Sequence, residues 1–348
     1  MAVKIEKFAS EHGEITLATI TNSKGASVVL SSLGAGVTAI NVSDSAGNIV
    51  NVVTTYADPA DFMSDGPCAG KTPGRYANRI ANATFQIDGK EYRLKATNGP
   101  HHLHGGPTGF QNRIWDVCVE DDETVAFSRI SPDGEEGYPG TLDTRVAYTW
   151  NDDNALTIHY TGVTDAPTIL NLTNHTYFNL AGENSGDILD HELRLACSRW
   201  LPTDAGQIPT GEIASVEGTP MDFTATKAIG RDINDDFEAL HIGKGYDHCF
   251  VADNWVPGRL APIAWLRDPK TGRELTISTT QPAVQLYTAN WFGGETPLNP
   301  EGRPYQNREG VALECQHFPD SPNHQNFPLT VLREGEVFDE TIVFSFKA

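Results

Sequence analysis

The 348-residue chain has little of several features that would each point to a particular class of protein. Its five cysteines are an odd number, lie far apart and form no Cys-x-x-Cys pair. This is the pattern of reduced thiols in a cytoplasmic protein, and it argues against a disulfide framework. No run of about 18 apolar residues could cross a bilayer, and charges stand near the N-terminus where a signal peptide needs an apolar core. We therefore expect a cytoplasmic protein without a membrane partner.

Positive charge is scarce as well. The sequence has 25 Lys and Arg against 46 Asp and Glu, which gives a formal net charge of −21. A surface of this sign repels the phosphates of nucleic acids and of anionic membranes. We therefore expect no nucleic-acid partner, and a neutral or cationic small molecule as the ligand.

Long helical patterns are also missing. The chain has 32 glycines and 21 prolines, and no amphipathic helix longer than about three turns can be found. Region 219–243 is the best place for short helices, and Asp88-Gly89 is a type I′ hairpin signal. Segments with strand character lie at 15–21, 26–33, 37–42, 49–55, 84–94, 113–120, 124–130, 141–150, 155–163, 191–197, 263–267, 274–279, 284–289, 329–332 and 337–346, and within 310–320. They predict an all-β fold, a large antiparallel β-sandwich with a few short helices, as a single domain over residues 1–348.

Two segments resemble cofactor sites only superficially. Residues 66–72 resemble a phosphate-binding loop, but three residues instead of four precede the Gly-Lys pair and no helix can follow Pro73. In segment 98–106, His102 and His104 could face one metal ion, yet no third ligand follows at a telling spacing. The alternative is one working imidazole, His104, on a glycine turn that lets a ligand approach closely. We expect neither a cofactor nor a metal.

The segment 171–180, NLTNHTYFNL, alternates with period two and predicts a strand. Its apolar residues would pack on a core, while His175 and Tyr177 would lie together on the opposite face. A rigid strand that holds polar groups in line is a common support for a binding or catalytic surface. A half-buried strand with a polar outer face and no site explains this segment equally well.

Glu314 stands in a run that is otherwise apolar from Val311 onward. A carboxylate in such a strand should be desolvated, which raises its proton affinity and suits a general base near neutral pH. A structural ion pair is the alternative interpretation. An imidazole at the same site could deliver a proton to one oxygen while the carboxylate removes one from another, which is acid–base chemistry on a hydroxylated ligand. The candidate polar residues are Asn78, Arg79, His104, His175, Tyr177, Asp247, Gln285 and Glu314.

Six segments together resemble one family. They are GRYANRIANATF (74–85), LHGG (103–106), NLTNHTYFNLAG (171–182), GYDH (245–248), QPAVQLYTAN (281–290) and ALECQHFPDSPN (312–323). They resemble, in the same order, the signature segments of the aldose 1-epimerase (galactose mutarotase) family. The resemblance implies a large β-sandwich with an open cleft. It also implies a cofactor-independent isomerase of hexose metabolism that interconverts the α and β anomers of free aldoses such as galactose and glucose. We expect a monomer or a weak homodimer.

The resemblance also implies roles for individual residues. Glu314 falls on the family's catalytic base and His175 on its acid, while His104 binds the sugar and supports catalysis. The implied sugar contacts are Asn78, Arg79, His104, Tyr177, Asp247 and Gln285. The base would take the proton of the C1 hydroxyl, the acid would protonate the ring oxygen, and the opened sugar would rotate about C1–C2 and reclose.

Two segments depart from the family pattern and leave the preferred sugar open. Segment 65–73 lacks the aromatic-rich character expected before the arginine motif, and loop 293–309 is somewhat long. Two other functions compete with the mutarotase. One is a catalytically silent sugar-binding or regulatory protein, which would need no base. The other is an epimerase of phosphorylated sugars, which would need several cationic groups around the cleft.

Overall fold

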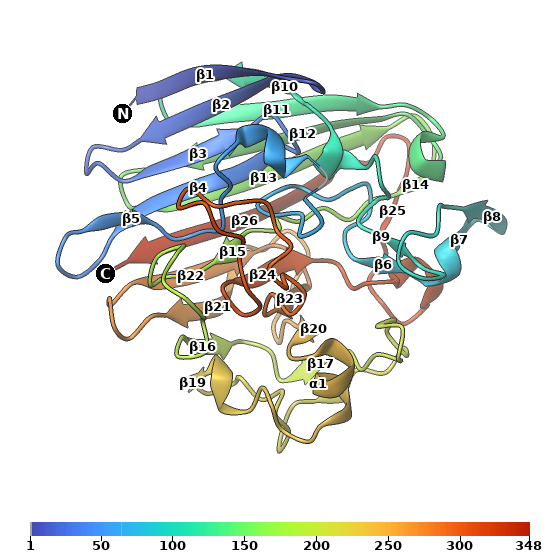
Figure 1. Ribbon diagram of the computed structural model, residues 1–348. Helices are drawn as coiled ribbons and strands as arrows, with labels where there is room; N and C mark the ends of the chain where they lie inside the picture. Colours follow the sequence, from blue (N-terminus) through green and yellow to red (C-terminus); the bar gives the residue numbers. More distant parts are fainter. Residues whose placement is uncertain (1, 64) are drawn as a thin grey trace.

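The computed structural model describes residues 2–63 and 65–348, and three antiparallel sheets dominate it (Figure 1). The first sheet is built from the N-terminal strands in sequence order. These strands are β1 (Ala2–Ser10), β2 (Gly13–Thr21), β3 (Ser27–Ser31), β4 (Gly36–Ser43) and β5 (Ile49–Asn51). Strand β1 was not predicted, because this edge strand is largely exposed and its charged residues mask the alternation.

The second sheet has nine strands and takes its members from both halves of the chain. In spatial order they are β10 (Asp116–Val119), β11 (Thr124–Ser131), β12 (Leu142–Trp150), β13 (Ala155–Thr164), β26 (Phe338–Lys347), β22 (Glu274–Thr279), β21 (Ala261–Arg267), β16 (Glu192–Leu195) and β19 (Lys227–Ala228). The C-terminal strand β26 lies between β13 and β22, so the end of the chain joins the two halves of this sheet.

The third sheet has six strands and carries most of the candidate polar residues. Its order is β15 (Tyr177–Phe178), β24 (Val311–Gln316), β23 (Ala283–Tyr287), β20 (Asp247–Val251), β17 (Arg199–Trp200) and β18 (Ala214–Ser215). An isolated bridge between Val53 and Phe178 connects this sheet to the end of the first one.

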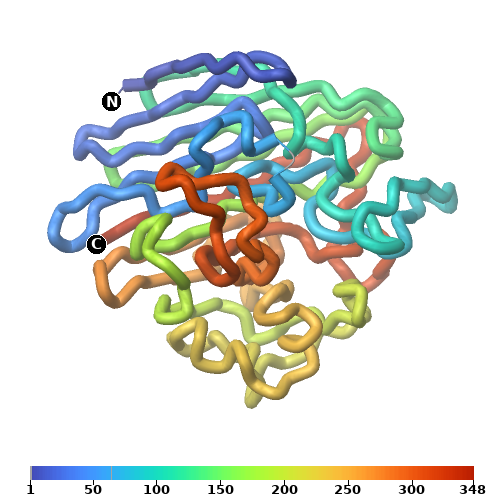
Figure 2. The backbone as a smooth tube through the Cα atoms, viewed as in Figure 1, coloured from blue at the N-terminus to red at the C-terminus, as the bar shows by residue number. Residues whose placement is uncertain are grey.

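The nine-stranded sheet runs behind the other two sheets (Figures 1 and 2). One hydrophobic core contains side chains of all three sheets, including Leu30 of the first, Val146 of the second and Leu313 of the third. Because each strand contributes alternate residues to this core, the layers form the sandwich that the alternating segments predicted. The prediction of an all-β sandwich is confirmed.

Short pairs and turns complete the fold. The two-stranded pairs are β6 (Arg79–Ile80) with β9 (His102–Leu103), β7 (Thr84–Ile87) with β8 (Lys90–Arg93), and β14 (Thr168–Ile169) with β25 (Val331–Leu332). The helical elements are the 3-10 turns Pro59–Phe62, Ala81–Ala83, Phe110–Asn112, Glu135–Gly137, Ile229–Arg231 and Ser321–Asn323, and the α-helix α1 (Glu238–Gly243).

Two local predictions are confirmed among these elements. Asp88 and Gly89 have φ angles of 53° and 81°, as the type I′ turn between β7 and β8 requires. Short helical elements do occur in region 219–243, where α1 lies. No helix in the described ranges is long and apolar enough to cross a membrane.

The prediction of a strand over 171–180 is wrong in most of its length. Only Tyr177 and Phe178 pair as a strand, and all ten residues are buried, so no polar face is open to solvent. The reason lies in the asparagines, whose amides replace sheet partners. Asn171 donates to the carbonyls of Ala77 and His317, and Asn174 donates to that of Gly70 at 2.8 Å. The segment therefore runs through the interior and is held by side-chain hydrogen bonds and isolated backbone hydrogen bonds instead of a continuous ladder.

Candidate active site

A cleft of about 1190 Å³ opens over the six-stranded sheet and collects most of the candidate residues. Seven of the eight predicted site residues line it: Asn78, Arg79, His104, His175, Tyr177, Asp247 and Glu314. Gln285 does not line the cleft; it is buried on the neighbouring strand of the same sheet and donates to Asp247 Oδ1 at 2.7 Å. A single site thus brings together groups that are more than 200 residues apart in sequence.

Glu314 lies in β24, between β15 and β23, where all six residues of the strand are buried. Its side chain is 2% exposed, and its Oε2 atom has no hydrogen-bond partner among the described residues. Burial raises the pKa of the Glu314 carboxyl well above its ordinary value; the nearby Asp247 carboxylate adds to the shift and Arg79 opposes it. The desolvated carboxylate expected from the sequence is therefore present.

His175 faces Glu314, with 3.4 Å between His175 Nε2 and Glu314 Oε2. Both the N–H and the carbonyl of His175 form backbone hydrogen bonds with residues 70 and 71. The His175 N–H donates to Lys71 O, and its carbonyl accepts from the Gly70 N–H, each at 2.9 Å. Burial lowers the pKa of the imidazole to about 4, because the charged ring would lose its hydration. The two groups of the pair are thus each shifted toward their neutral forms.

His104 lies beside His175, with 5.2 Å between the ring centroids. Its Nδ1 accepts the Asn78 backbone N–H at 3.1 Å, so the proton of the neutral ring is on Nε2. Burial and the neighbouring His175 and Arg79 hold the pKa of His104 well below its usual range. His104 is therefore a hydrogen-bond donor toward a ligand at neutral pH.

This tautomer bears on the metal interpretation. The donor atoms of His104, His175 and Glu314 lie within 4.8 Å of one another, a spacing that a metal ion could bridge. A ligating imidazole normally donates its second N–H to an acceptor, whereas His104 accepts at Nδ1 and so carries its proton on the other nitrogen. His102 points elsewhere and bonds to Tyr138 Oη and Lys95 O. The donor set fits a hydroxylated ligand better than a metal.

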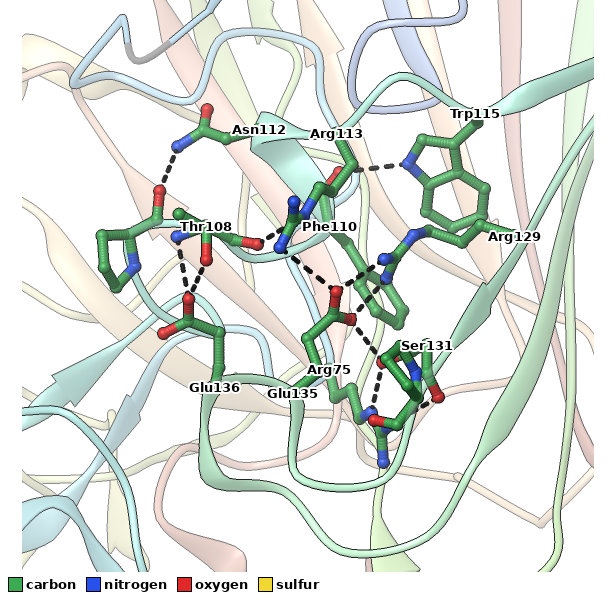
Figure 3. Close-up of polar contacts among 12 residues, drawn as sticks. Arg75, Thr108, Phe110, Asn112, Arg113, Trp115, Arg129, Ser131, Glu135 and Glu136 are labelled. Atoms are coloured by element: carbon green, nitrogen blue, oxygen red, sulfur yellow. Dashed lines mark hydrogen bonds and ion pairs between the residues drawn. The ribbon is translucent and has the colours of Figure 1, made fainter.

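A network of polar contacts holds the chain that follows the His104 turn. Figure 3 shows this network around Thr108, Arg113 and Glu135. Glu136 accepts from the Thr108 hydroxyl and backbone, and Arg113 Nε donates to Thr108 O at 2.9 Å. Glu135 in turn binds both Arg113 and Arg129. Because these contacts hold the chain just after the turn, the position of the imidazole does not depend on the turn alone.

The turn also needs its glycine. A Cβ atom on Gly105, whose φ is +79°, would lie 1.8 Å from the carbonyl oxygen of Gly74. Only glycine permits this approach of two backbones. The sequence interpretation of a glycine turn holding His104 is thus supported by the packing.

A row of hydrogen-bonded side chains forms one wall of the cleft. Arg79 Nε donates to Asn98 Oδ1 at 3.1 Å, and Arg79 Nη2 donates to Gln207 Oε1 at 2.6 Å. Gln207 Nε2 donates in turn to Asp247 Oδ2 at 2.8 Å. Asn98 and Gln207 were not predicted from the sequence, because each stands in a polar loop without a motif and only the tertiary structure brings it to Arg79.

Comparison with known proteins identifies the family of this chain. The profile of the family described as aldose 1-epimerase matches residues 16–345. The chain belongs to the aldose 1-epimerase family. The match includes every candidate residue of the cleft, so the resemblance carried by the six sequence segments is confirmed.

Related proteins align with this family member over nearly its full length. It is 41% identical to the galactose mutarotase of Bos taurus over 315 residues, which cover 90% of this chain and 89% of that protein. It is 37% identical to the aldose 1-epimerase of Escherichia coli over 335 residues, 95% of each chain. The GalM/aldose epimerase homologue from C. elegans superposes with a TM-score of 0.86 at 31% identity and 99% coverage of both chains. The predicted enzyme class, an isomerase, is confirmed with the family.

Tyr177 serves this aldose 1-epimerase family member as a wall of the cleft. Its hydroxyl donates to Pro67 O at 2.9 Å, and its ring lies 4.8 Å from that of Phe292, centroid to centroid. It also packs on the His175 ring, with centroids 4.9 Å apart. Tyr177 therefore connects the His175 imidazole to the rim of the cleft.

The two segments that depart from the family pattern form that rim. Asp65, Gly66 and Pro67 line the cleft, and so do residues 295–298. Both segments line the same cleft as His175 and Glu314. Their placement agrees with the expectation that they bear on sugar preference.

Lys71 connects several of the segments that form the cleft. Its Nζ lies 2.6 Å from Asp65 Oδ1, and both side chains are 1% exposed. The same ammonium donates to the carbonyl of Phe62 and, at 3.2 Å, to Asn112 Oδ1. Its own carbonyl accepts from the backbone of His175. The buried Lys71 thus connects the rim and the turn after His104 through its ammonium, and the His175 backbone through its carbonyl.

We expect Lys71→Met to destabilise the protein by about 3–5 kcal/mol, because it leaves the buried Asp65 carboxylate without its partner. The free energy of unfolding from urea titrations measures this loss. Lys227→Met is the matched control, since Lys227 also forms a buried pair, 2.7 Å from Asp232, but lies outside the cleft. Both variants should be destabilised, and only Lys71→Met should also lose sugar binding in calorimetry. Equal sugar binding in both would contradict the role given to Lys71.

Proposed function

We propose that the protein is an aldose 1-epimerase that interconverts the α and β anomers of free aldohexoses such as galactose and glucose. Glu314 is the base and His175 the acid. The observation that carries the proposal is the contact of 3.4 Å between these two buried groups, at the bottom of a cleft lined by hydrogen-bonding side chains. The motifs of the sequence and the names of the relatives support the same reaction.

The geometry suits ring opening because the two reacting oxygens of an aldose share one carbon. O1 and the ring oxygen O5 are both bonded to C1, so the acid and the base that serve them must lie side by side. Glu314 takes the proton of the C1 hydroxyl and His175 gives a proton to O5 while the C1–O5 bond breaks. Rotation about C1–C2 and reclosure with the proton transfers reversed produce the other anomer.

Burial of the pair assists this step. Ring opening converts a carboxylate and an imidazolium into a carboxylic acid and a neutral imidazole. The raised pKa of Glu314 and the lowered pKa of His175, which is about 4, both favour the neutral forms. When the one proton of the pair is on His175, the Glu314 carboxylate is therefore a stronger base and the His175 imidazolium a stronger acid than either group in water, so both proton transfers of ring opening are favoured. The Nε2–H of His104 and the Arg79 guanidinium are the donors that would stabilise negative charge developing on oxygen.

Orphaned polar atoms also point to a hydroxylated ligand. Glu314 Oε2 and His175 Nδ1 are buried without a hydrogen-bond partner in the chain as described. Unsatisfied buried polar atoms are costly, and a bound ligand is one way in which they are satisfied. The hydroxyl groups of an aldose would supply the missing partners.

A phosphorylated sugar fits the cleft less well. Among the described lining residues Arg79 is the only Lys or Arg, whereas six carboxylates line the same space. They are Glu11, Asp61, Asp65, Asp247, Glu295 and Glu314. A phosphate dianion would meet net repulsion in this cleft. A free aldose is therefore the proposed substrate, with a monomeric or weakly dimeric protein in the cytoplasm.

Polarimetry of freshly dissolved α-D-galactose and α-D-glucose tests the proposal. The protein should accelerate the approach to the equilibrium rotation at neutral pH, in proportion to its concentration, while a heat-inactivated sample should match buffer. No acceleration with any aldose of a broad panel would refute the enzyme. Calorimetric sugar binding without mutarotation would instead favour the silent sugar-binding protein.

A further inference from the structure

A loop outside the sequence motifs reaches into the cleft. Gln207 lies between β17 and β18 in the left-handed conformation, with a φ of 60°. The Asp204 side chain closes the turn by accepting the N–H groups of Gly206 and Ile208, at 2.8 and 3.1 Å. The Gln207 N–H donates to the Asp204 carbonyl at 2.9 Å. A well-bonded turn therefore presents this glutamine to the cleft.

Gln207 stands between two opposite charges. Its Oε1 accepts from Arg79 at 2.6 Å and its Nε2 donates to Asp247 at 2.8 Å. On the far side of each charge lies another amide, Asn98 for the guanidinium and Gln285 for the carboxylate. Within the described residues no carboxylate oxygen lies within 4.0 Å of the Arg79 guanidinium, so the charge of this mostly buried arginine is not cancelled by a direct ion pair.

Such an arrangement keeps both charged groups available to a ligand. Without a spacer, Arg79 and Asp247 would attract each other across the partly desolvated cleft, and each would occupy the other's hydrogen-bonding groups. The Gln207 amide forms one hydrogen bond to each charged group. The remaining N–H groups of Arg79 and the remaining lone pairs of Asp247 stay free for a ligand. Its orientation is fixed, because only its oxygen can accept from arginine and only its nitrogen can donate to aspartate.

We propose that Gln207 is a positioning residue for sugar recognition. It holds Arg79 and Asp247 apart so that two adjacent hydroxyl groups of an aldose bind together, one donating to Asp247 and its neighbour accepting from Arg79. The inference rests on the proposed function of the cleft and adds to it the recognition of a vicinal diol by a separated cation and anion. Gln207 acts through these two residues and not on the reacting bond.

Gln207→Leu removes both hydrogen bonds at nearly constant volume. KM for galactose or glucose should rise about 10- to 100-fold, the range for losing hydrogen bonds to charged groups, while kcat changes little. Gln207→Glu is isosteric, and its carboxylate would pair with Arg79 and repel Asp247, so KM should rise at least as much. Gln86→Leu, on the exposed face of β7, is the control and should behave as wild type. Tm should fall by only a few degrees in the two Gln207 variants, because hydrogen bonds to charged groups are lost, and should be unchanged in the control.

Monodeoxy sugars test whether Gln207 acts on particular sugar hydroxyl groups or weakens sugar binding in general. One or two deoxy positions should raise KM in the wild type and produce no further increase in Gln207→Leu, because variant and sugar remove the same interaction. Fully additive penalties for every deoxy sugar, an unchanged KM, or a loss of kcat together with Tm would overturn the inference. Should the wild type show no mutarotation, the proposed function itself fails. An active wild type with an unaffected Gln207→Leu overturns only the role of Gln207.

Discussion

Replacing Glu314 by glutamine is expected to lower kcat by about 10³-fold, the middle of the range for removing a general base. The amide keeps the shape of the carboxyl group but cannot accept the proton of the C1 hydroxyl. KM should stay within a few-fold of the wild type, because the wall formed by Arg79, Gln207 and Asp247 is untouched. Polarimetric progress curves over a range of galactose concentrations give both constants.

Stability provides an independent readout for the same variant. The pKa of Glu314 is raised in the folded protein, so its contribution to stability is present at low pH and is lost as the pH rises through the folded pKa. The amide has no such loss, and Glu314→Gln should have a higher Tm than wild type at pH 8. Glu217→Gln, an exposed glutamate outside the cleft, is the control for both measurements. Retained kcat in Glu314→Gln would eliminate Glu314 as the base.

Acidification is expected to remove most of the stability of the fold between pH 6.5 and pH 4. His175, His191 and His248 are buried, and burial lowers the pKa of each from 6.5 to about 4. Their neutral forms contribute stability that is fully present above pH 6.5 and is lost as the pH falls through that window. Each shift corresponds to about 3 kcal/mol, and three of them approach the total stability of a typical domain.

The hydrogen bonds of two of these rings explain why they resist protonation. His191 Nε2 accepts the Leu180 N–H at 2.9 Å, and His248 Nδ1 accepts the Asp247 N–H at 3.0 Å. A protonated ring cannot accept, so charging it costs a backbone hydrogen bond as well as burial.

The free energy of unfolding from urea titrations at pH 7, 6, 5 and 4 measures the acid effect. His248→Gln should lose about 3 kcal/mol less than wild type across this range, because one of the three titrating groups is gone. The exposed His241→Gln should leave the slope unchanged. A wild-type protein equally stable at pH 7 and pH 4 would contradict the prediction.

Local sequence carried enough information for the catalytic pair but not for its surroundings. Glu314 was identifiable because a carboxylate in an apolar run is either paired or functional, and it is buried as that reasoning requires. His175 was found for a reason that was only half correct. Its alternation with apolar residues suggested an open strand face, whereas Asn171 and Asn174 turn the segment into a buried thread held by their amides.

Other features depended on contacts that no local pattern encodes. β1 was missed because an exposed edge strand needs no apolar alternation. Gln207 was missed because its partner Arg79 lies 128 positions away and its loop has no motif. Gln285 was expected to touch the sugar, but it donates to Asp247 from a buried position on the neighbouring strand.

The backbone clamp on His175 has a consequence for protein engineering. Residues 70 and 71, which bond to both sides of His175, belong to the same segment as Asp65 and Pro67 on the rim. A library that randomises or transplants 65–73 to change the preferred sugar would therefore also displace His175, the proposed proton donor. Changes in segment 65–73 would therefore alter substrate selectivity and turnover together. Loop 293–309 makes no hydrogen bond to the His175 backbone within the described chain, so its variation offers the more separable route to a new substrate range.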